Sequence, residues 1–149
     1  MAYKNKQECS ELEIKDIVNY LSKTPVRFFA EKNNDFRWFK VEVECPEDLQ
    51  DLKTWWGELN GLKKNEQNDE EKFGLVEVAD MINSNSLPDK ELKAKILEYR
   101  ELLKNNELEV KITLFENGLD VLIADGNKRA VAMLLEGKKV GLNAILITT

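Results

Sequence analysis

The stretch LFENGLDVLIADGNKRAVAMLL, residues 114–135, decides how the C-terminal part of this chain folds. Alternating apolar residues flank Asn117-Gly118, the strongest short signal for a β-hairpin, because both positions of a tight two-residue turn must tolerate positive φ. A compact polar turn follows at residues 125–129, and an apolar segment follows the turn. We therefore expect a hairpin, a polar turn and a helix in direct succession.

Four predicted elements complete this part of the chain. Residues 108–115 form the first strand of the hairpin and residues 119–124 form the return strand. Residues 130–136 form a short apolar helix that ends at Gly137, because glycine is the usual residue just beyond a helix C-terminus. Residues 140–148 then form a closing strand.

A helix and a strand are predicted in the first 45 residues. Ser10 and Glu13 form a capping box, which marks the start of a helix. Residues 36–45 alternate apolar and polar side chains, as a half-buried strand does. Residues 26–30 are a short apolar run that fits either a strand or a helix, and we expect the two runs to pair as a hairpin. Residues 1–9 are polar and are expected to be frayed.

A further helix is predicted over residues 46–60, where leucines and a tryptophan recur at helical spacing. Trp55 and Trp56 are adjacent, so both rings cannot point inward from one helix. One ring is expected in the core, and the other at the surface, either partly covered or in contact with a ligand or partner.

Polar and helical segments alternate between this helix and the C-terminal third. Residues 62–72 are nearly all polar or charged and are predicted to form a mobile loop. Residues 73–82 fit a short helix. Residues 88–104 fit the longest helix of the chain, with Ser86 as its N-cap.

Length and composition fit one α+β domain over residues 1–149, in which a small mixed β-sheet is covered by helices. The hydrophobic fraction is 42% and the charged fraction 34%, as in globular proteins with a well-charged surface. The net charge is -6. Proteins that neutralise many DNA phosphates are usually basic, so extended binding to duplex DNA is not expected.

The sequence also predicts where the protein resides. No apolar run approaches the roughly 20 residues that a membrane-spanning helix needs, and the N-terminus lacks the apolar core of a signal peptide. We therefore expect a cytoplasmic protein with no membrane partner. Cys9 and Cys45 are far apart and form no CxxC motif, so reduced structural thiols are expected.

The chain contains no histidine. This excludes Ser-His-Asp and Cys-His nucleophile systems, histidine general bases and the usual zinc sites. Any catalysis must use carboxylates, Lys, Arg, Tyr, Ser or Thr side chains, backbone N–H groups, or a hard metal ion such as Mg²⁺. No dedicated set of metal-binding residues is predicted.

The polar turn DGNKR, residues 125–129, is suited to binding an anion such as a phosphate group. The N-terminus of a helix has unpaired N–H groups and a partial positive charge, and Gly126 lets a ligand approach the backbone. Lys128 and Arg129 add positive charge, and Arg129 can hold a phosphate bidentately. Asp125 could orient Arg129, bind Mg²⁺ or act as a base.

A purely structural role would explain the same residues. Asp125 and Asn127 would then cap the helix, and Arg129 would pair with Asp125. This interpretation predicts no ligand, and no loss of function when Arg129 is replaced by alanine.

The pattern LxxDGNxRxxAxxxxG, followed by a strand, resembles the core of the ParB/sulfiredoxin-like fold. That superfamily includes ParB-like nuclease domains and a free-serine kinase. The resemblance covers residues 108–149, and it implies that the turn holds nucleotide phosphates. The implied phosphate contacts come from Gly126, Asn127, Lys128 and Arg129, with Asp125 supporting the turn.

The chain departs from its relatives at several positions. Sulfiredoxins have their catalytic cysteine at the place of Asn127, so that activity is not expected. ParB partition proteins have a second arginine at the place of Val131, and no helix-turn-helix segment follows the motif before Thr149, so a partition clamp is not expected either. Many relatives have histidine where Lys128 stands, so the chemistry of that histidine does not carry over.

DGNKR also resembles the core of Fic/Doc AMP-transferases and their phosphotransferase relatives. Those enzymes need a catalytic histidine several residues upstream, and their motif lies between long helices. Neither feature is present here.

The leading hypothesis is a nucleotide-binding domain that acts as an ATP- or CTP-dependent phosphotransferase or NTPase, with Mg²⁺ as a candidate cofactor. Asp125 and Lys128 are the candidate catalytic residues. Two alternatives stay open: a non-catalytic module that binds a protein partner or DNA, and a metal-dependent nuclease. Four charged residues are further candidates for completing the pocket: Glu31, Glu42, Glu44 and Arg100.

Overall fold

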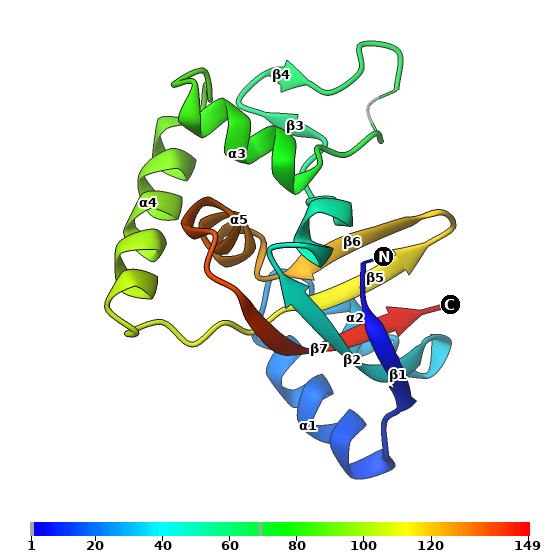
Figure 1. Cartoon of the computed structure of the whole chain (residues 1–149). Coiled ribbons are helices and arrows are strands. Elements are labelled where there is room, and N and C mark those ends of the chain that lie inside the picture. The colour runs from blue at the N-terminus through cyan, green and yellow to red at the C-terminus, as the bar shows by residue number, and fades with distance from the viewer. Residues whose placement is uncertain (1, 69) are drawn as a thin grey trace.

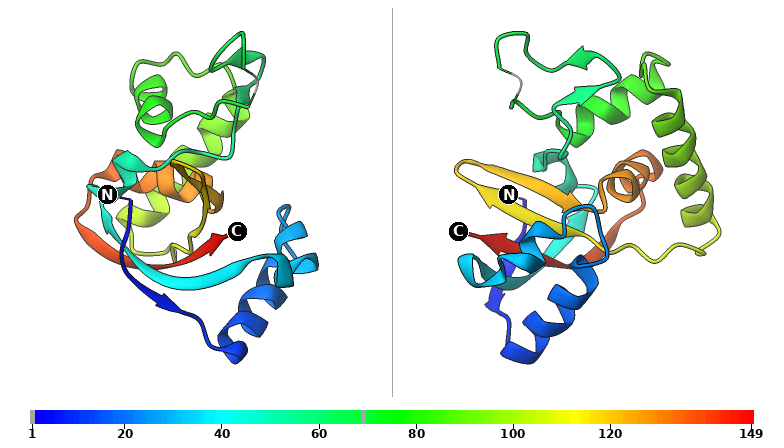
Figure 2. Two further views of the ribbon diagram at one scale, coloured as in Figure 1. Left: turned by 90° about the vertical axis from the view of Figure 1, so that its right-hand side faces the viewer. Right: turned by 180° about the vertical axis from the view of Figure 1, so that it is seen from behind.

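A mixed five-stranded β-sheet with helices on both faces forms the centre of the molecule (Figures 1 and 2). The structure is a computed structural model, and it describes residues 2–68 and 70–149. A second, two-stranded sheet lies apart from the central one, next to a helix (Figure 1). This architecture confirms the predicted α+β class with a small mixed sheet covered by helices.

The strands of the central sheet come from both ends of the chain. In spatial order they are β1 (Lys4–Glu8), β2 (Arg37–Cys45), β7 (Val140–Thr148), β5 (Thr113–Asn117) and β6 (Asp120–Asp125). The longest pairing joins β2 and β7 antiparallel, from Arg37 opposite Thr148 to Cys45 opposite Val140. β5 and β7 pair in parallel, and the other pairs are antiparallel.

The helices divide between the two faces of the sheet. The α-helices of the described residues are α1 (Glu11–Leu21), α2 (Phe28–Glu31), α3 (Leu75–Asn83), α4 (Lys90–Lys104) and α5 (Asn127–Glu136). Two short 3₁₀ turns are η1 (Asn33–Asp35) and η2 (Asp48–Asp51), and the small sheet pairs β3 (Glu58–Leu59) with β4 (Leu62–Lys63). α5 packs against both α3 and α4, while α1 packs against α2.

Side chains of β2 point alternately to the two faces of the sheet, and they contribute to two separate apolar cores. Its odd-numbered residues, such as Val41 and Val43, lie in the larger core beneath α3, α4 and α5. Trp38 lies on the opposite face, where it is buried with Ile147 against α1 and α2. Aromatic rings enlarge this second core around Phe29. Trp38 shares this face with the polar residues Lys40 and Glu42, but the helices cover the end of the face at Trp38.

Several local predictions are confirmed. Ser10 and Glu13 form the capping box of α1, with both reciprocal hydrogen bonds present. The β5–β6 hairpin forms, but its turn lies one residue later than predicted: Asn117 pairs with Asp120, so Gly118 and Leu119 are the turn positions, with a φ of 64° at Gly118. The closing strand has the predicted bounds.

Three predictions in the first 60 residues are wrong. Residues 4–8 form the edge strand β1 instead of fraying, because they pair with β2. Residues 26–30 do not pair as a hairpin strand and contribute to α2. Residues 46–60 form the short η2 turn and strand β3 instead of a helix, because the chain between them extends along the sheet edge and bonds to it at Lys53.

The remaining boundaries shift for local reasons. α4 begins at Lys90, because Asp89 and not Ser86 accepts the capping bond from the N–H of Leu92. Within residues 62–72 the chain forms β4, and Lys64 pairs with Glu77 of α3. Asp69 of that segment lies outside the described residues.

Candidate functional site

The DGNKR turn joins the end of β6 directly to α5. α5 begins at Asn127, three residues before the predicted start, so Asn127, Lys128 and Arg129 form its first turn. The first helical hydrogen bond runs from the N–H of Ala130 to the carbonyl of Gly126, at 2.9 Å. The N–H groups of the first turn therefore have no partner within the helix and are available to a ligand.

Gly126 is required by the folding of the chain itself. Its φ is 97°, in the left-handed region, and a Cβ built on it would lie 2.5 Å from the carbonyl oxygen of Lys111. The segment before β5 therefore occupies the space that a side chain would need. We expected this glycine to admit a ligand, and on that side it admits the backbone of Lys111.

Asn127 fastens the turn to a distant segment. Its Oδ1 accepts a hydrogen bond from the N–H of Trp55, at 2.9 Å, and its Nδ2 donates to the carbonyl of Ile123, also at 2.9 Å. Oδ1 and one N–H of Nδ2 are used, so a contact of Asn127 with a phosphate can come from its backbone N–H or from the second N–H of Nδ2. The side chain also sets the position of Trp55.

Asp125 is held by α1. The hydroxyl of Tyr20 donates to Oδ2 of Asp125 at 2.8 Å. Burial raises the pKa of Tyr20, the hydrogen bond to Asp125 raises it further, and the neighbouring Arg129 opposes both effects. Tyr20 is therefore a neutral donor at physiological pH, and Asp125 keeps its second carboxylate oxygen for other partners.

Arg129 has a buried donor that the protein does not satisfy. Its Nε is fully buried and has no hydrogen-bond partner. Its guanidinium carbon lies 5.8 Å from the centre of the Tyr99 ring. Among the described residues, no carboxylate lies within ion-pair distance of Arg129, so the Arg129–Asp125 pair of the purely structural interpretation does not form in this structure. Arg129 as a whole is half-buried, but a buried N–H donor without an acceptor is unfavourable, which marks this position as one where an anion fits.

A pocket of about 290 Å³ opens over the turn, and we call it the turn pocket. Residues 124–129 form its floor, and three half-buried aromatic residues (Trp55, Trp56 and Tyr99) contribute to its walls. Lys128 is exposed at its rim, and no ion pair is found for it within residues 2–68 and 70–149. The structure thus brings all five predicted site residues together with aromatic side chains that are remote in sequence.

Trp55 and Trp56 point into different parts of the molecule, as we expected for two adjacent residues. Trp55 packs against the aromatic cluster around Phe29, and Trp56 packs against the larger core. Both do so from an extended segment, so the predicted helix was not needed. Both rings also border the turn pocket.

The further candidate residues lie elsewhere. Arg100 pairs with Glu136 at 3.1 Å, and Glu44 pairs with Lys4 at 2.7 Å. Glu31 lies near Arg27, at 3.6 Å, and Glu42 accepts a hydrogen bond from Asn5. None of them borders the turn pocket.

Tyr20 and Tyr99 are the site residues that the sequence did not indicate. Tyr20 precedes the turn by 105 positions, and only tertiary folding brings its hydroxyl to Asp125. The ring of Tyr99 packs at the larger core, and it also faces Arg129. Only the Trp55-Trp56 pair carried a signal in the sequence.

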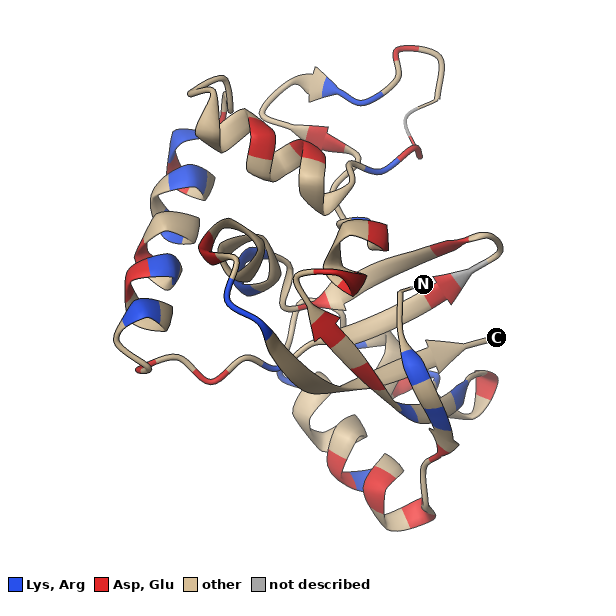
Figure 3. Cartoon of the chain, in the orientation of Figure 1, with Lys and Arg blue, Asp and Glu red and all other residues tan. Residues whose placement is uncertain are grey.

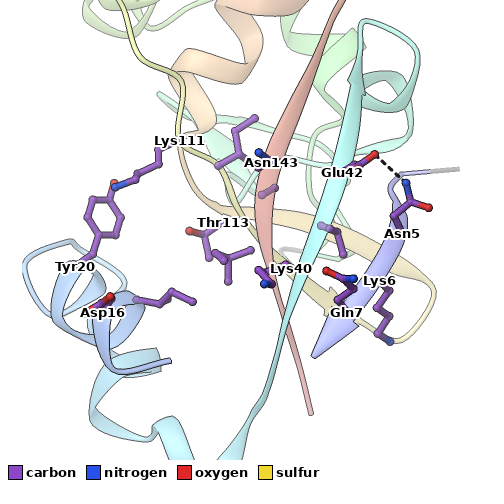
Figure 4. Close-up of a pocket in the computed structure, with 15 residues that line it drawn as sticks. Asn5, Lys6, Gln7, Asp16, Tyr20, Lys40, Glu42, Lys111, Thr113 and Asn143 are labelled. Atoms are coloured by element: carbon purple, nitrogen blue, oxygen red, sulfur yellow. Dashed lines mark hydrogen bonds between the residues drawn. The ribbon is translucent and has the colours of Figure 1, made fainter. Parts of the chain in front are cut away.

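A larger hollow, which we call the sheet groove, lies on the face of the sheet beside α1 (Figure 4). Its volume is about 810 Å³. The side chains of Tyr20 and Lys111 lie at one side of it, Asn143 lies on the central strand β7, and Asn5 lies on β1 at the other side (Figure 4). The groove exists because α1 and α2 cover only the Trp38 end of this face.

The described residues offer no ready-made metal centre and no membrane span. Over residues 2–68 and 70–149, no three acidic or cysteine side chains are grouped so that they could hold a metal ion. No described helix combines the length and the apolar character needed to cross a bilayer.

No protein-family model matches the chain, and neither a curated protein nor a solved structure matches it.

Proposed function

We propose that the chain binds a nucleoside triphosphate, ATP or CTP, in the turn pocket and acts as a ParB/sulfiredoxin-like phosphotransferase or NTPase. The observation that carries this proposal is the buried Nε of Arg129, which has no partner in the protein. A terminal phosphate placed against it supplies the missing acceptor and the missing negative charge. Such charge-assisted hydrogen bonds are the strongest that a protein makes with phosphate.

The first turn of α5 supports the same placement. Its three free N–H groups and the helix dipole favour an anion at this end. α5 has no acidic residue in its first turn, so the protein does not fill this position itself. Lys128 at the rim adds a mobile positive charge that can follow the phosphate during transfer.

The walls of the turn pocket support binding of the base. Trp55, Trp56 and Tyr99 present partly exposed rings beside the turn. Stacking on aromatic side chains is the usual way in which proteins hold a nucleobase. The pocket therefore combines a phosphate end and an aromatic end.

Two residues are assigned the chemistry. Lys128 stabilises the negative charge of the transferred phosphoryl group, and Asp125 accepts a proton through the carboxylate oxygen that Tyr20 leaves free. Mg²⁺ would enter with the nucleotide, bound mainly by its phosphates and water, with Asp125 as the one nearby carboxylate ligand. The free thiols of Cys9 and Cys45 agree with the reducing cytoplasm that we propose as its location.

Calorimetric titration with ATP or CTP in the presence of Mg²⁺ tests the proposal. We expect one nucleotide to bind, and Arg129→Ala to weaken it roughly 30-fold, as the loss of a hydrogen bond to a charged group does. Arg37→Ala is the matched control, because this arginine is exposed and pairs with Glu8. Absence of binding at millimolar nucleotide, or equal affinity in the two variants, would contradict the proposal.

A binding module without turnover is the second candidate. Phe28 is 39% exposed, and its ring centre lies 6.2 Å from that of Trp55, so the aromatic surface extends beyond the turn pocket. Such a surface suits a protein partner. Phosphorus NMR of a mixture of chain, nucleotide and Mg²⁺ separates the two candidates, since a binding module leaves the nucleotide intact.

A metal-dependent nuclease remains a third hypothesis. Lysines and acidic residues alternate along α4, so that helix presents both charges together (Figure 3). Incubation of the protein with plasmid DNA and Mg²⁺ or Mn²⁺ tests this activity directly.

A further inference from the structure

The sheet groove is a second hollow that the proposed function leaves without a role. Its volume of about 810 Å³ lies within the range of small-molecule sites and far exceeds that of a single inorganic ion. It is bounded by α1 on one side and by strands β1, β2 and β7 on the other (Figure 4). It is therefore suited to an organic molecule of moderate size.

The walls of the groove carry many uncharged hydrogen-bonding groups. Two of them are hydroxyls, and three are amides that can both donate and accept. The residues are Asn5, Gln7, Tyr20, Thr113 and Asn143. Aliphatic side chains lie between them, at Ile17 and Ile145. Alternating polar and aliphatic contacts match a molecule with many hydroxyl groups on a carbon chain.

One lysine of the groove is available to a ligand. Lys40 is paired with Glu13 at 2.8 Å. The Nζ of Lys6 lies over Phe39, which belongs to the larger core on the opposite face of the sheet. The Nζ of Lys111 lies 4.6 Å from the centre of the Tyr20 ring, and no carboxylate lies at ion-pair distance from it among the described residues. Two acidic side chains, Asp16 and Glu42, also line the groove and limit the negative charge that a ligand can carry.

The groove and the turn pocket share a wall. Tyr20 lines the groove, and its hydroxyl bonds to Asp125 of the turn pocket at 2.8 Å. Thr113 of the groove stands opposite Asp125 in the pairing of β5 with β6. Lys111 extends its side chain along the groove, while its carbonyl oxygen closes over Gly126. A ligand at this end of the groove is therefore adjacent to the phosphate-binding turn.

We propose that the sheet groove binds a small polyhydroxylated molecule with one anionic group, of the sugar-acid class, as the phosphoryl acceptor. Its anionic group binds Lys111, and its hydroxyls face Thr113 and Asn143. This role rests on the proposed function. A hydroxyl oxygen bonds to the terminal phosphorus of the nucleotide, the bond from that phosphorus to the bridging oxygen breaks, and the hydroxyl proton passes to Asp125 as the nucleoside diphosphate leaves.

Ligand-observed NMR with gluconate as the probe tests this assignment, with sorbitol as its uncharged counterpart. We expect gluconate to bind at millimolar concentration and sorbitol to bind more weakly. Lys111→Ala should weaken gluconate roughly tenfold, as the loss of one charge-assisted contact does, and leave sorbitol unchanged. Lys15→Ala is the matched control, since Lys15 is exposed on α1 and does not line the groove.

A second variant blocks the groove. Asn143 is exposed on β7, so Asn143→Phe places a ring in the groove without entering either core. We expect it to abolish gluconate binding and to leave the affinity for nucleotide unchanged. In the wild type with ATP or CTP and Mg²⁺, phosphorus NMR should show a new phosphate ester when gluconate is added.

The outcomes separate the two proposals. If nucleotide binds but gluconate does not, or if gluconate binds equally to wild type, Lys111→Ala and Asn143→Phe, the groove assignment is overturned and the proposed function stands. If gluconate binds as expected but neither nucleotide does, the proposed function and the acceptor role fail together. If both bind and no ester forms, the acceptor role is overturned.

Discussion

The two ends of α5 have the same kinds of residue, a glycine and an arginine, but these residues have different surroundings. A glycine with positive φ stands at each end, Gly126 at 97° before the helix and Gly137 at 69° after it. An arginine also lies at each end, Arg129 in the first turn and Arg100 beside the last residue, Glu136.

At the C-terminal end the protein satisfies its own groups. The Nε of Arg100 bonds to Glu136 at 3.1 Å, and a Cβ on Gly137 would meet nothing within 4 Å. At the N-terminal end the carbonyl of Lys111 crowds Gly126, and the Nε of Arg129 is buried without a partner. The C-terminal end is therefore satisfied within the protein, whereas the N-terminal end combines a closely packed backbone with a buried Nε that has no acceptor.

The N-termini of the other long helices differ from that of α5 in their charge. α1 has Glu11 and Glu13 in its first turn, α3 has Glu77, and α4 is capped by Asp89. Each of these N-termini therefore has an acidic group of its own close to its N–H groups. The first turn of α5 has two cations instead, which is unfavourable unless an anion from outside binds there.

The largest expected effect separates the two glycines. Gly126→Ala should lower the free energy of unfolding by about 3–4 kcal/mol, because left-handed strain and a collision with the backbone of Lys111 act together. Gly137→Ala should lower the free energy of unfolding by only about 1 kcal/mol, since its Cβ would have the left-handed strain but no collision. Urea unfolding measures both. Equal losses in the two variants would show that the turn can relax away from Lys111.

The next largest change in stability is expected when the side-chain hydrogen bonds of Asn127 are removed. Asn127→Ala should lower the free energy of unfolding by about 2 kcal/mol, because the N–H of Trp55 and the carbonyl of Ile123 both lose a partner. Asn19→Ala, at an exposed position on α1, serves as the control and should change it by less than about 0.5 kcal/mol. A loss at Asn127 no larger than the control's would mean that water replaces the amide.

Substitutions of Arg100 and Arg129 should change the free energy of unfolding by small amounts of opposite sign. Arg100→Met should lower the free energy of unfolding by about 1 kcal/mol, because it leaves Glu136 without its partner. Arg129→Met should leave it unchanged or raise it by up to about 1 kcal/mol, since a buried donor without an acceptor disappears. Thermal unfolding without ligand measures the pair. A larger loss at Arg129 than at Arg100 would show that Arg129 is a structural residue.

Much of the C-terminal third follows from local sequence. The hairpin at Gly118, the helix stop at Gly137 and the strand at 140–148 each depend on residues within a few positions. The same holds for the Ser10–Glu13 capping box. Such signals are strong because the contacts they predict are made by neighbours in the chain.

The segment 46–60 shows where local reasoning ends. Its apolar residues recur at helical spacing, yet Leu49, Leu52 and Leu59 are buried from a mostly extended chain. The N–H and carbonyl of Lys53 bond to Val121 and Ile123 on β6, which covers that edge of the sheet. Backbone partners far away in sequence thus outweighed helical periodicity.

The candidate site divides in the same way. The five residues of the turn could be predicted, because helix start, glycine and cations are adjacent in sequence. The hold of Tyr20 on Asp125 and the ring of Tyr99 beside Arg129 could not be predicted, because each contact joins elements that meet only in the folded chain.

Binding of an anion at Arg129 can be observed through its side-chain Nε–H resonance by nitrogen–proton NMR. The chain has four arginines, so the resonance can be assigned with an Arg129→Lys variant. We predict that ATP or CTP with Mg²⁺ shifts this resonance downfield as the buried Nε–H gains a phosphate acceptor, while those of Arg27, Arg37 and Arg100 stay in place. An unchanged Arg129 resonance at saturating nucleotide would show that the nucleotide phosphate does not bind the Nε–H of Arg129.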